Sequence, residues 1–182
     1  GSVTIKLSDE GFYNVIVGCT DMGTGCDTII AQFVADSLDT DIDNIAVFGV
    51  DTDTSPYDSG SYASSTTYLT GMAAVKAAEQ MREKLLQLAA KILEEDITKL
   101  EFDGKRVFCE ETGKEVSLFD LATASMVNNE IALEVTYSHS SPVSPPPFMA
   151  ACAEVEVDPE TGAIELLDYT ACVDCGTVVN TN

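Results

Sequence analysis

Basic residues are scarce in this sequence. Nine lysines and arginines stand against 31 aspartates and glutamates, which gives a formal net charge of −22. Proteins that bind nucleic-acid phosphates or an anionic membrane surface do so with Lys and Arg, so this composition argues against both partners. An anion bound here would be held mainly by backbone amides and hydroxyl groups, and we expect such a site to be local and buried.

Other signals are missing as well. No run of about 18 apolar residues occurs, so no transmembrane helix is expected. Residues 1–10 lack the apolar core of a secretory signal peptide, and Gly1-Ser2 is typical of a cloning scar. Six cysteines without such a signal argue against a disulfide framework and favour a cytoplasmic protein with reduced thiols. The one histidine, His139, has no acid or nucleophile pattern near it, so no catalytic triad is assembled.

The apolar pattern predicts an α+β domain with mixed sheets, in which hairpins pack against helices. Alternation and turn residues predict three hairpins and two further strands, at 3–17, 100–109, 148–173, 45–50 and 133–137. Spacings of three and four residues predict three helices, over 27–38, 66–95 and 118–126. We expect Asp27 or Thr28 to cap the first of them, and we expect the polar segment 51–65 to be a long loop.

The stretch Gly18–Thr28 reads as the end of a strand, a glycine-rich turn and the start of a helix. Free N–H groups at such a helix start, together with the helix dipole, form a site for an anion. Gly23-Thr24-Gly25 lacks the third glycine of a dinucleotide-binding loop and the Gly-Lys-Ser/Thr of a phosphate-binding P-loop. A purely structural turn therefore remains an alternative for this segment.

A second helix start follows at Ser64-Ser65-Thr66-Thr67, where hydroxyls and N-terminal amides again occur together. Taken alone, an ordinary N-cap with additional serines is the favoured interpretation. Taken together, the two helix starts predict a site that holds one phosphorylated ligand at two points.

No metal site is expected. Asp51, Asp53 and Asp58 lack the glycine and the terminal glutamate of a calcium-binding loop, which favours a solvated turn. Cys172 and Cys175 form a single C-x-x-C without the second pair of ligands that zinc needs.

Several further stretches occur in a particular order. Gly18–Thr28 is followed by Ala31-Gln32-Phe33-Val34-Ala35, and then by Asp51-Thr52-Asp53, Pro56, Ala63-Ser64-Ser65 and Gly71. Pro145-Pro146-Pro147-Phe148, the run 153–162 and Asp174-Cys175-Gly176 complete the series. In this order and spacing, the stretches resemble the molybdopterin-binding region of the xanthine dehydrogenase/aldehyde oxidase family, over nearly all 182 residues.

The resemblance implies one part of the large subunit of a molybdenum hydroxylase. Such an enzyme oxidises a purine, an N-heterocycle or an aldehyde with an oxygen atom derived from water. The implied cofactor is molybdopterin with molybdenum, often as the cytosine dinucleotide, while iron–sulfur clusters and FAD belong to other domains or subunits. The implied partners are the remainder of the large subunit, the iron–sulfur and flavin subunits, and a small-molecule substrate.

The resemblance also assigns roles to residues. Gly23, Thr24 and Gly25 would offer amides to the dithiolene and pterin region of the cofactor. In the family this loop reads Gly-Gln-Gly and its glutamine lies beside the molybdenum, so Thr24 is a departure.

The resemblance also implies that the phosphate of the cofactor binds at the second helix start, where it would be held by Ala63, Ser64 and Thr66. The family's catalytic glutamate lies beyond the equivalent of Asn182. We therefore expect residues 1–182 to be part of a cofactor-binding domain, incomplete at the C-terminal end and inactive alone. A non-catalytic binding or assembly module that kept the fold is the alternative, and a nucleotide-dependent transferase is a weaker one.

Overall fold

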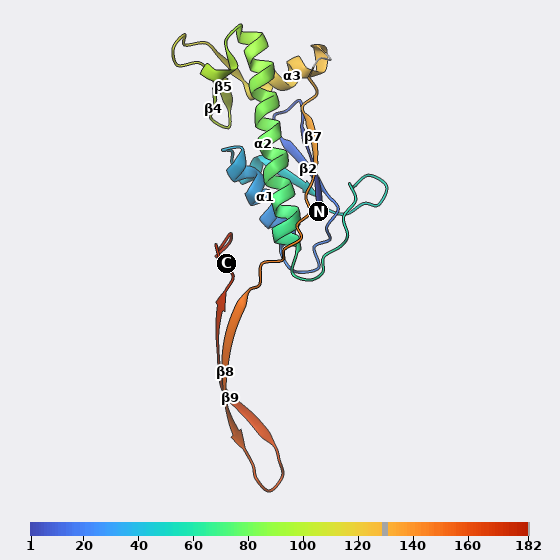
Figure 1. The fold of residues 1–182 in the computed structure, drawn as a ribbon, viewed down its shortest axis with the longest axis vertical. Helices are drawn as coiled ribbons and strands as arrows, with labels where there is room; N and C mark the ends of the chain where they lie inside the picture. The colour runs from blue at the N-terminus through green and yellow to red at the C-terminus, as the bar shows by residue number, and fades with distance from the viewer. Residues whose placement is uncertain (129–130, 182) are drawn as a thin grey trace. The chain divides into compact units, whose positions relative to one another are not determined.

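The computed structural model describes residues 1–128 and 131–181 (Figure 1). It divides into two compact units, Gly1–Pro142 and Val143–Asn182. The larger unit contains two sheets and all of the described helices, while the smaller unit contains one long hairpin. None of the described helices is long and apolar enough to cross a membrane.

A four-stranded sheet with the order β3-β2-β1-β7 organises the larger unit. Its strands are β1 (Ser2–Leu7), β2 (Tyr13–Val17), β3 (Ile45–Phe48) and β7 (Glu134–Ser138). β1 runs antiparallel to both β2 and β7, whereas β2 and β3 are parallel. The sheet is therefore mixed, and its central strand joins chain segments from the two ends of this unit.

The register of β1 separates an apolar face from a polar one. Val3 and Ile5 are fully buried and lie opposite apolar residues of both β2 and β7. On the other face, hydroxyl pairs cross between the strands: Ser2 Oγ lies 2.8 Å from Ser138 Oγ. One apolar face and one hydrogen-bonded polar face are the signature of a sheet covered on one side by helices.

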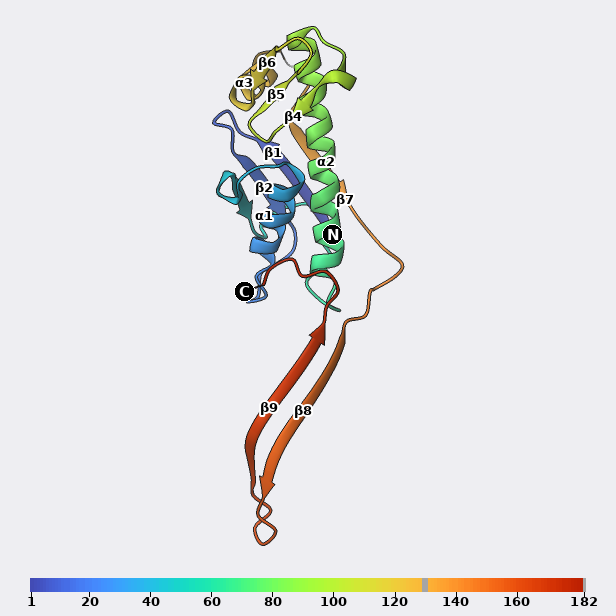
Figure 2. The ribbon, with the colours of Figure 1, turned by 90° about the vertical axis from the view of Figure 1, so that its left-hand side faces the viewer.

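Two helices cover the apolar face, α1 (Cys26–Ser37) and α2 (Thr66–Leu93), as Figures 1 and 2 show. α2 presents small residues to α1 and the sheet, and the alanines of this face are fully buried: Ala73, Ala74, Ala77 and Ala78. At Gly71 the approach is so close that an added Cβ would lie 2.6 Å from the Phe33 ring. The small side chains therefore allow the long helix to lie directly against its neighbours.

A small sheet lies along the C-terminal part of α2. Its strands have the order β4-β5-β6, and they are β4 (Glu101–Phe102), β5 (Arg106–Phe108) and β6 (Glu115–Ser117). The helix α3 (Leu118–Asn128) and the 3₁₀ turns η1 (Ile42–Asn44) and η2 (Ile97–Lys99) complete the unit. Arg82 of α2 donates to Asp39 Oδ2 at 2.8 Å and to the Phe102 carbonyl at 2.8 Å, which ties this sheet to the end of α1.

The smaller unit is an antiparallel hairpin of β8 (Phe148–Val157) and β9 (Ile164–Asp174). Its turn is closed by the Asp158 carboxylate, which accepts the Thr161 hydroxyl at 2.6 Å and the Glu160 amide at 2.8 Å. Every residue of both strands is exposed in the structure.

The α+β class, the mixed sheets and the three predicted hairpins are confirmed. The expected cap of the first helix is wrong: α1 begins at Cys26, and its N-cap is Gly25 in a left-handed conformation without a side-chain cap. β6 was not predicted, because three residues are too few for an alternating pattern. The helix at Thr66 was predicted at its observed start, but it ends at Leu93, where Glu94 adopts a left-handed φ of 54°.

Tyr13 provides the first test of this core. Its side chain is fully buried, its hydroxyl has no hydrogen-bond partner among the described residues, and burial raises its pKa well above the ordinary range. A buried hydroxyl without a partner costs about 1–3 kcal/mol, so Tyr13→Phe is expected to leave stability unchanged or to raise it by about 1 kcal/mol. Thermal and urea denaturation measure this, with Ile5→Ala as the matched core control, expected to lose about 2–5 kcal/mol. A loss above about 1 kcal/mol in Tyr13→Phe would show that the hydroxyl is bonded.

Gly104 provides the second test. Its φ is +85°, and an added Cβ would lie 1.9 Å from the Asp39 carbonyl oxygen. Gly113 has a φ of +70° but open space where the Cβ would stand, so it carries the same backbone strain without the clash. We expect Gly113→Ala to cost about 1–2 kcal/mol in the free energy of unfolding, and Gly104→Ala to cost clearly more. Equal losses in urea denaturation would mean that the Asp39 contact does not constrain this turn.

Candidate functional site

The long loop 49–65 is held against the end of β2 by a close backbone approach. An added Cβ on Gly18 would lie 2.4 Å from the Pro56 carbonyl oxygen and 2.6 Å from the Asp58 Cβ. Any larger residue would therefore push the loop away, and glycine at this position is required by space rather than by its φ.

Two hydrogen bonds fix the loop on either side of this approach. Ser61 Oγ donates to the Thr20 carbonyl at 3.0 Å, which joins the loop to the glycine-rich stretch. Thr70 Oγ1 donates to Asp58 Oδ2 at 3.1 Å, and the buried Thr70 belongs to the first turns of α2. The loop thus brings the start of α2 next to the glycine-rich stretch.

A cavity of about 390 Å³ lies between these segments. Its lining residues are Met22, Thr24, Cys26, Ser61, Tyr62, Ala63, Ser64, Ser65, Thr66 and Thr67. Of the six residues predicted from the sequence, Thr24, Ala63, Ser64 and Thr66 therefore meet at one cavity, while Gly23 and Gly25 flank Thr24 without lining it. The expectation of a buried site is wrong for these residues: Thr24, Ala63 and Ser64 are exposed.

The backbone next to the cavity is strained. Ala63 and Ser64 both have a φ of 54°, and the Ser65 amide donates to the Tyr62 carbonyl at 3.2 Å across them. Two positive φ values across such a bond define a type I′ turn, which normally takes Asn-Gly. A left-handed φ costs a residue with a Cβ about 1–3 kcal/mol, and strain of this kind concentrates at functional sites.

The first turn of α2 carries the donors that an anion needs. Its N-cap, Ser65, makes no side-chain cap, since its hydroxyl donates to the Tyr62 carbonyl at 2.7 Å instead. The amides of Thr66 and Thr67 have no hydrogen-bond partner among the described residues. These amides, the positive end of the helix dipole and the surrounding hydroxyls suit a phosphate group, so the donor set fits the phosphorylated cofactor that the sequence suggests.

The glycine-rich loop is different, because its amides are already engaged. One oxygen of the Asp21 carboxylate accepts the amides of Gly23, Thr24 and Gly25 at 2.9, 3.1 and 3.2 Å. These hydrogen bonds, led by the one from Gly23, lower the pKa of Asp21. The expectation of free amides in this loop is therefore corrected: the chain supplies its own anion there.

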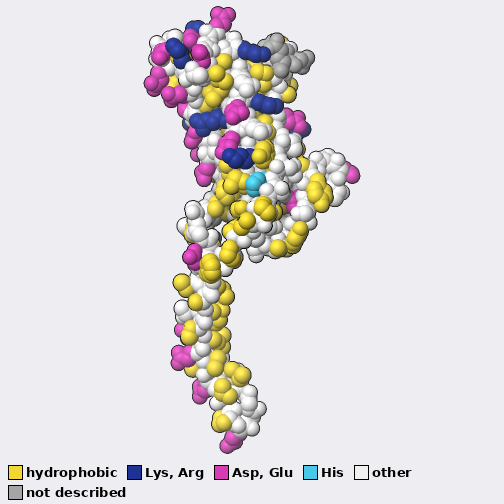
Figure 3. All heavy atoms as spheres, in the orientation of Figure 1, with side chains coloured by type: hydrophobic (Ala, Val, Ile, Leu, Met, Phe, Trp, Pro, Cys, Tyr) yellow, Lys and Arg dark blue, Asp and Glu magenta, His cyan; other side chains and the backbone are white. Residues whose placement is uncertain are grey.

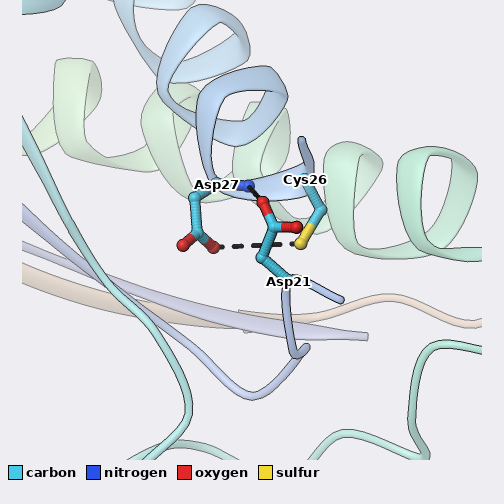
Figure 4. A group of neighbouring side chains, drawn as sticks. All are labelled: Asp21, Cys26 and Asp27. Carbon is cyan, nitrogen blue, oxygen red and sulfur yellow. Dashed lines mark hydrogen bonds between the residues drawn. The ribbon is translucent and has the colours of Figure 1, made fainter. Parts of the chain in front are cut away.

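Asp21, Cys26 and Asp27 form a small cluster at the start of α1 (Figure 4). Their ligand atoms lie within 4.8 Å of one another, and the Asp27 amide donates to the second Asp21 oxygen at 3.5 Å. Burial raises the pKa of the Cys26 thiol, which keeps it protonated at neutral pH. Because a thiol must lose its proton to bind a metal and Asp21 already accepts amides, we assign no metal to this cluster.

Sequence reasoning missed two features of the site. Asp21 follows a local pattern, an aspartate two residues before a glycine turn, that would have indicated an Asx-type hydrogen bond. Ser61 had no such signal, because its role depends on the Gly18 approach, which no local pattern encodes.

The family model described as "Molybdopterin cofactor-binding domain" matches residues 1–182. The chain therefore belongs to this family, and the resemblance read from its motifs is confirmed. It is 37% identical over 177 residues to the protein named "Probable hypoxanthine oxidase XdhD" of Escherichia coli (strain K12). It is 31% identical over 182 residues to the 6-hydroxypseudooxynicotine dehydrogenase complex subunit gamma of Paenarthrobacter nicotinovorans. Each match covers 97% of this chain, but the chain spans 18% of the first relative and 23% of the second.

Solved structures agree with the fold. The Cu,Mo-CO dehydrogenase matches with a TM-score of 0.84 and 31% identity, over 99% of this chain and 23% of that one. Quinoline 2-oxidoreductase from Pseudomonas putida 86 matches with a TM-score of 0.82 and 25% identity, over 98% of this chain and 24% of that one. The relatives are thus named as an oxidase, a dehydrogenase subunit, a Cu,Mo-CO dehydrogenase and an oxidoreductase, and this chain corresponds to about a quarter or less of each.

The hydrogen bonds from the loop amides to the Asp21 carboxylate can be tested by mutation. Asp21→Ala removes the acceptor, so the amides of Gly23, Thr24 and Gly25 are expected to exchange with solvent several-fold faster, with Asp21→Asn intermediate. Because the folded state lowers the pKa of Asp21, this stabilisation is present above the ordinary aspartate pKa and is lost as the pH falls from that value through the lowered pKa of the folded state. Amide NMR follows both effects. Asp9→Ala, on an exposed turn, is the control, and equal exchange in all variants would contradict the role of Asp21.

Proposed function

We propose that residues 1–182 are the part of a molybdenum hydroxylase large subunit that holds the phosphate-bearing portion of molybdopterin. The observation that carries this proposal is the meeting of Thr24 with Ala63, Ser64 and Thr66 at one cavity, next to first-turn amides without partners. These amides and hydroxyls compensate for the scarcity of Lys and Arg, because they supply positive potential without a charged side chain.

We assign the residues on the two sides of the cavity to different parts of the cofactor. Ser64 and Thr66 offer hydroxyls, and the start of α2 offers amides, to a phosphate or pyrophosphate group. The strained turn at Ala63 directs the backbone so that these donors converge. On the opposite side, Thr24 lines the cavity and would face the pterin. The loop of Gly23, Thr24 and Gly25 is held in shape by Asp21 rather than offering its amides.

The wider assignment follows from the family. When bound, the molybdenum cofactor supplies the redox chemistry that adds a water-derived oxygen to a purine, an N-heterocycle or an aldehyde. We also propose that the cofactor is the cytosine dinucleotide form, which the resemblance to the family implies. We further propose that the parent protein acts in the cytoplasm with the remainder of its large subunit and with iron–sulfur and flavin subunits. Residues 1–182 would be inactive alone.

A negative charge introduced at the start of α2 tests the proposal. In the full-length parent subunit, Thr66→Glu places a carboxylate where the phosphate would lie. Hydrogen bonds to a charged group contribute about 1.5–3 kcal/mol each, so bound molybdenum is expected to fall by about tenfold to a hundredfold. Molybdenum per polypeptide and the cytidine monophosphate released by acid hydrolysis measure the loss.

Thr123→Glu is the matched control, because it makes the same change on the exposed side of α3, away from the cavity. Undiminished molybdenum in Thr66→Glu would contradict the site. A wild-type subunit without molybdenum, after expression in a host that makes the cofactor, would instead favour a non-catalytic binding or assembly module. Thr24 in place of the family glutamine is the observation that keeps this second candidate open.

A further inference from the structure

The two faces of the β8–β9 hairpin differ sharply in chemistry. Residues that pair across the hairpin share a face, and the register pairs Met149 with Val173, Val155 with Leu166, and Val157 with Ile164. Three alanines and one tyrosine fill the positions between them on the same face. We call this the apolar face; along its whole length it carries no charged residue.

The apolar face is too exposed for an isolated hairpin in water. Ile164, Leu166 and Met149 are 70%, 61% and 66% exposed. Figure 3 shows the hydrophobic side chains along this arm as a nearly continuous strip. A two-stranded hairpin is at best marginally stable alone, and contiguous apolar patches of this kind mark contact surfaces.

The opposite face carries unfavourable charge pairs. Glu154 lies across from Asp168, and Glu156 lies across from Glu165, so like charges stand directly opposite each other. Such pairs destabilise a sheet, and no Lys or Arg occurs between Val143 and Asn182 to compensate for them. We call this the acidic face; its exposed carboxylates would pair favourably with basic groups on another surface.

Charge decides between two candidate occupants. A second copy could bury the apolar face, but it would bring another net charge of −22, and its own hairpin has no Lys or Arg to pair with the carboxylates. The chain spans only 18% and 23% of the lengths of its relatives, so most of a polypeptide of that size would lie outside residues 1–182. That portion can supply both an apolar surface and basic side chains.

We propose that the β8–β9 hairpin is a docking arm that inserts into the portion of its own large subunit outside residues 1–182. The apolar face packs on an apolar surface there, and Lys or Arg side chains pair with Glu154, Glu156, Glu165 and Asp168. This proposal rests on the proposed function, in which residues 1–182 are one part of a large subunit.

Photo-crosslinking in the purified full-length holoenzyme tests the docking arm. Leu166→p-benzoylphenylalanine places a probe on the apolar face, and Thr161→p-benzoylphenylalanine places the control probe in the exposed turn. Irradiation followed by peptide mass spectrometry is expected to join position 166 to the same polypeptide outside residues 1–182, with at least a severalfold lower yield from position 161. Photo-methionine in place of the native Met149 repeats the test on the same face without a bulky substitution.

Each other outcome overturns the proposal. The portion of the large subunit outside residues 1–182 would be excluded as the occupant by crosslinks from position 166 to a second copy, to another subunit or to residues 1–142. The absence of a crosslink from either probe on the apolar face would exclude it as well. Molybdenum is measured in the same preparations, which separates the two proposals. Bound molybdenum without the expected crosslink contradicts the docking arm alone, whereas the crosslink without molybdenum contradicts the cofactor site alone.

Discussion

The close packing of α2 against α1 and the sheet is the constraint on which the rest of the larger unit depends. A face of buried alanines and the contact between Gly71 and the Phe33 ring let the helix axis approach its neighbours. The same helix contacts the four-stranded sheet near its beginning and the three-stranded sheet near its end. Its first turn is therefore continuous with a helix that is packed in the core, and the amides of Thr66 and Thr67 point from a rigid support rather than from a loop.

The cavity at this helix start shows how a strongly acidic chain can offer an anion site. The positive potential comes from peptide dipoles and hydroxyl groups, which keep their orientation at every pH near neutrality. The two loops contribute in opposite ways. At α2 the amides of Thr66 and Thr67 have no partner among the described residues, whereas before α1 the Asp21 carboxylate accepts the loop amides of Gly23 and Gly25. It also accepts one first-turn amide of α1, that of Asp27, at 3.5 Å. A carboxylate of the chain itself thus lies at the start of α1, and no such group accepts the first amides of α2 among the described residues, although both starts have similar sequences of small and hydroxyl residues.

Local signals explain what could be predicted and what could not. The start of α2, the hairpin at 100–109 and the long hairpin at 148–173 follow from patterns within a few residues, and the structure confirms them. The parallel pairing of β2 with β3 and the place of β7 beside β1 depend on contacts between distant segments, which no local pattern encodes. The turn at Ala63 and Ser64 opposes its own residue preferences, so its shape is imposed by the Gly18 and Thr70 contacts of the loop. That Thr24 and Ser64 share one cavity is a consequence of that imposed shape.

The position of β1 in its sheet has a consequence for biosynthesis. β1 is a central strand, and one of its two neighbours is β7, so that Ser2 meets Ser138 across a separation of 136 residues. During translation at about 5–20 residues per second, β1 and β2 emerge many seconds before the strand that completes their sheet. Until then, one edge of β1 has unpaired backbone groups next to the apolar side chains of Val3 and Ile5. The sheet can therefore reach its native pairing only after Ser138 has left the ribosome.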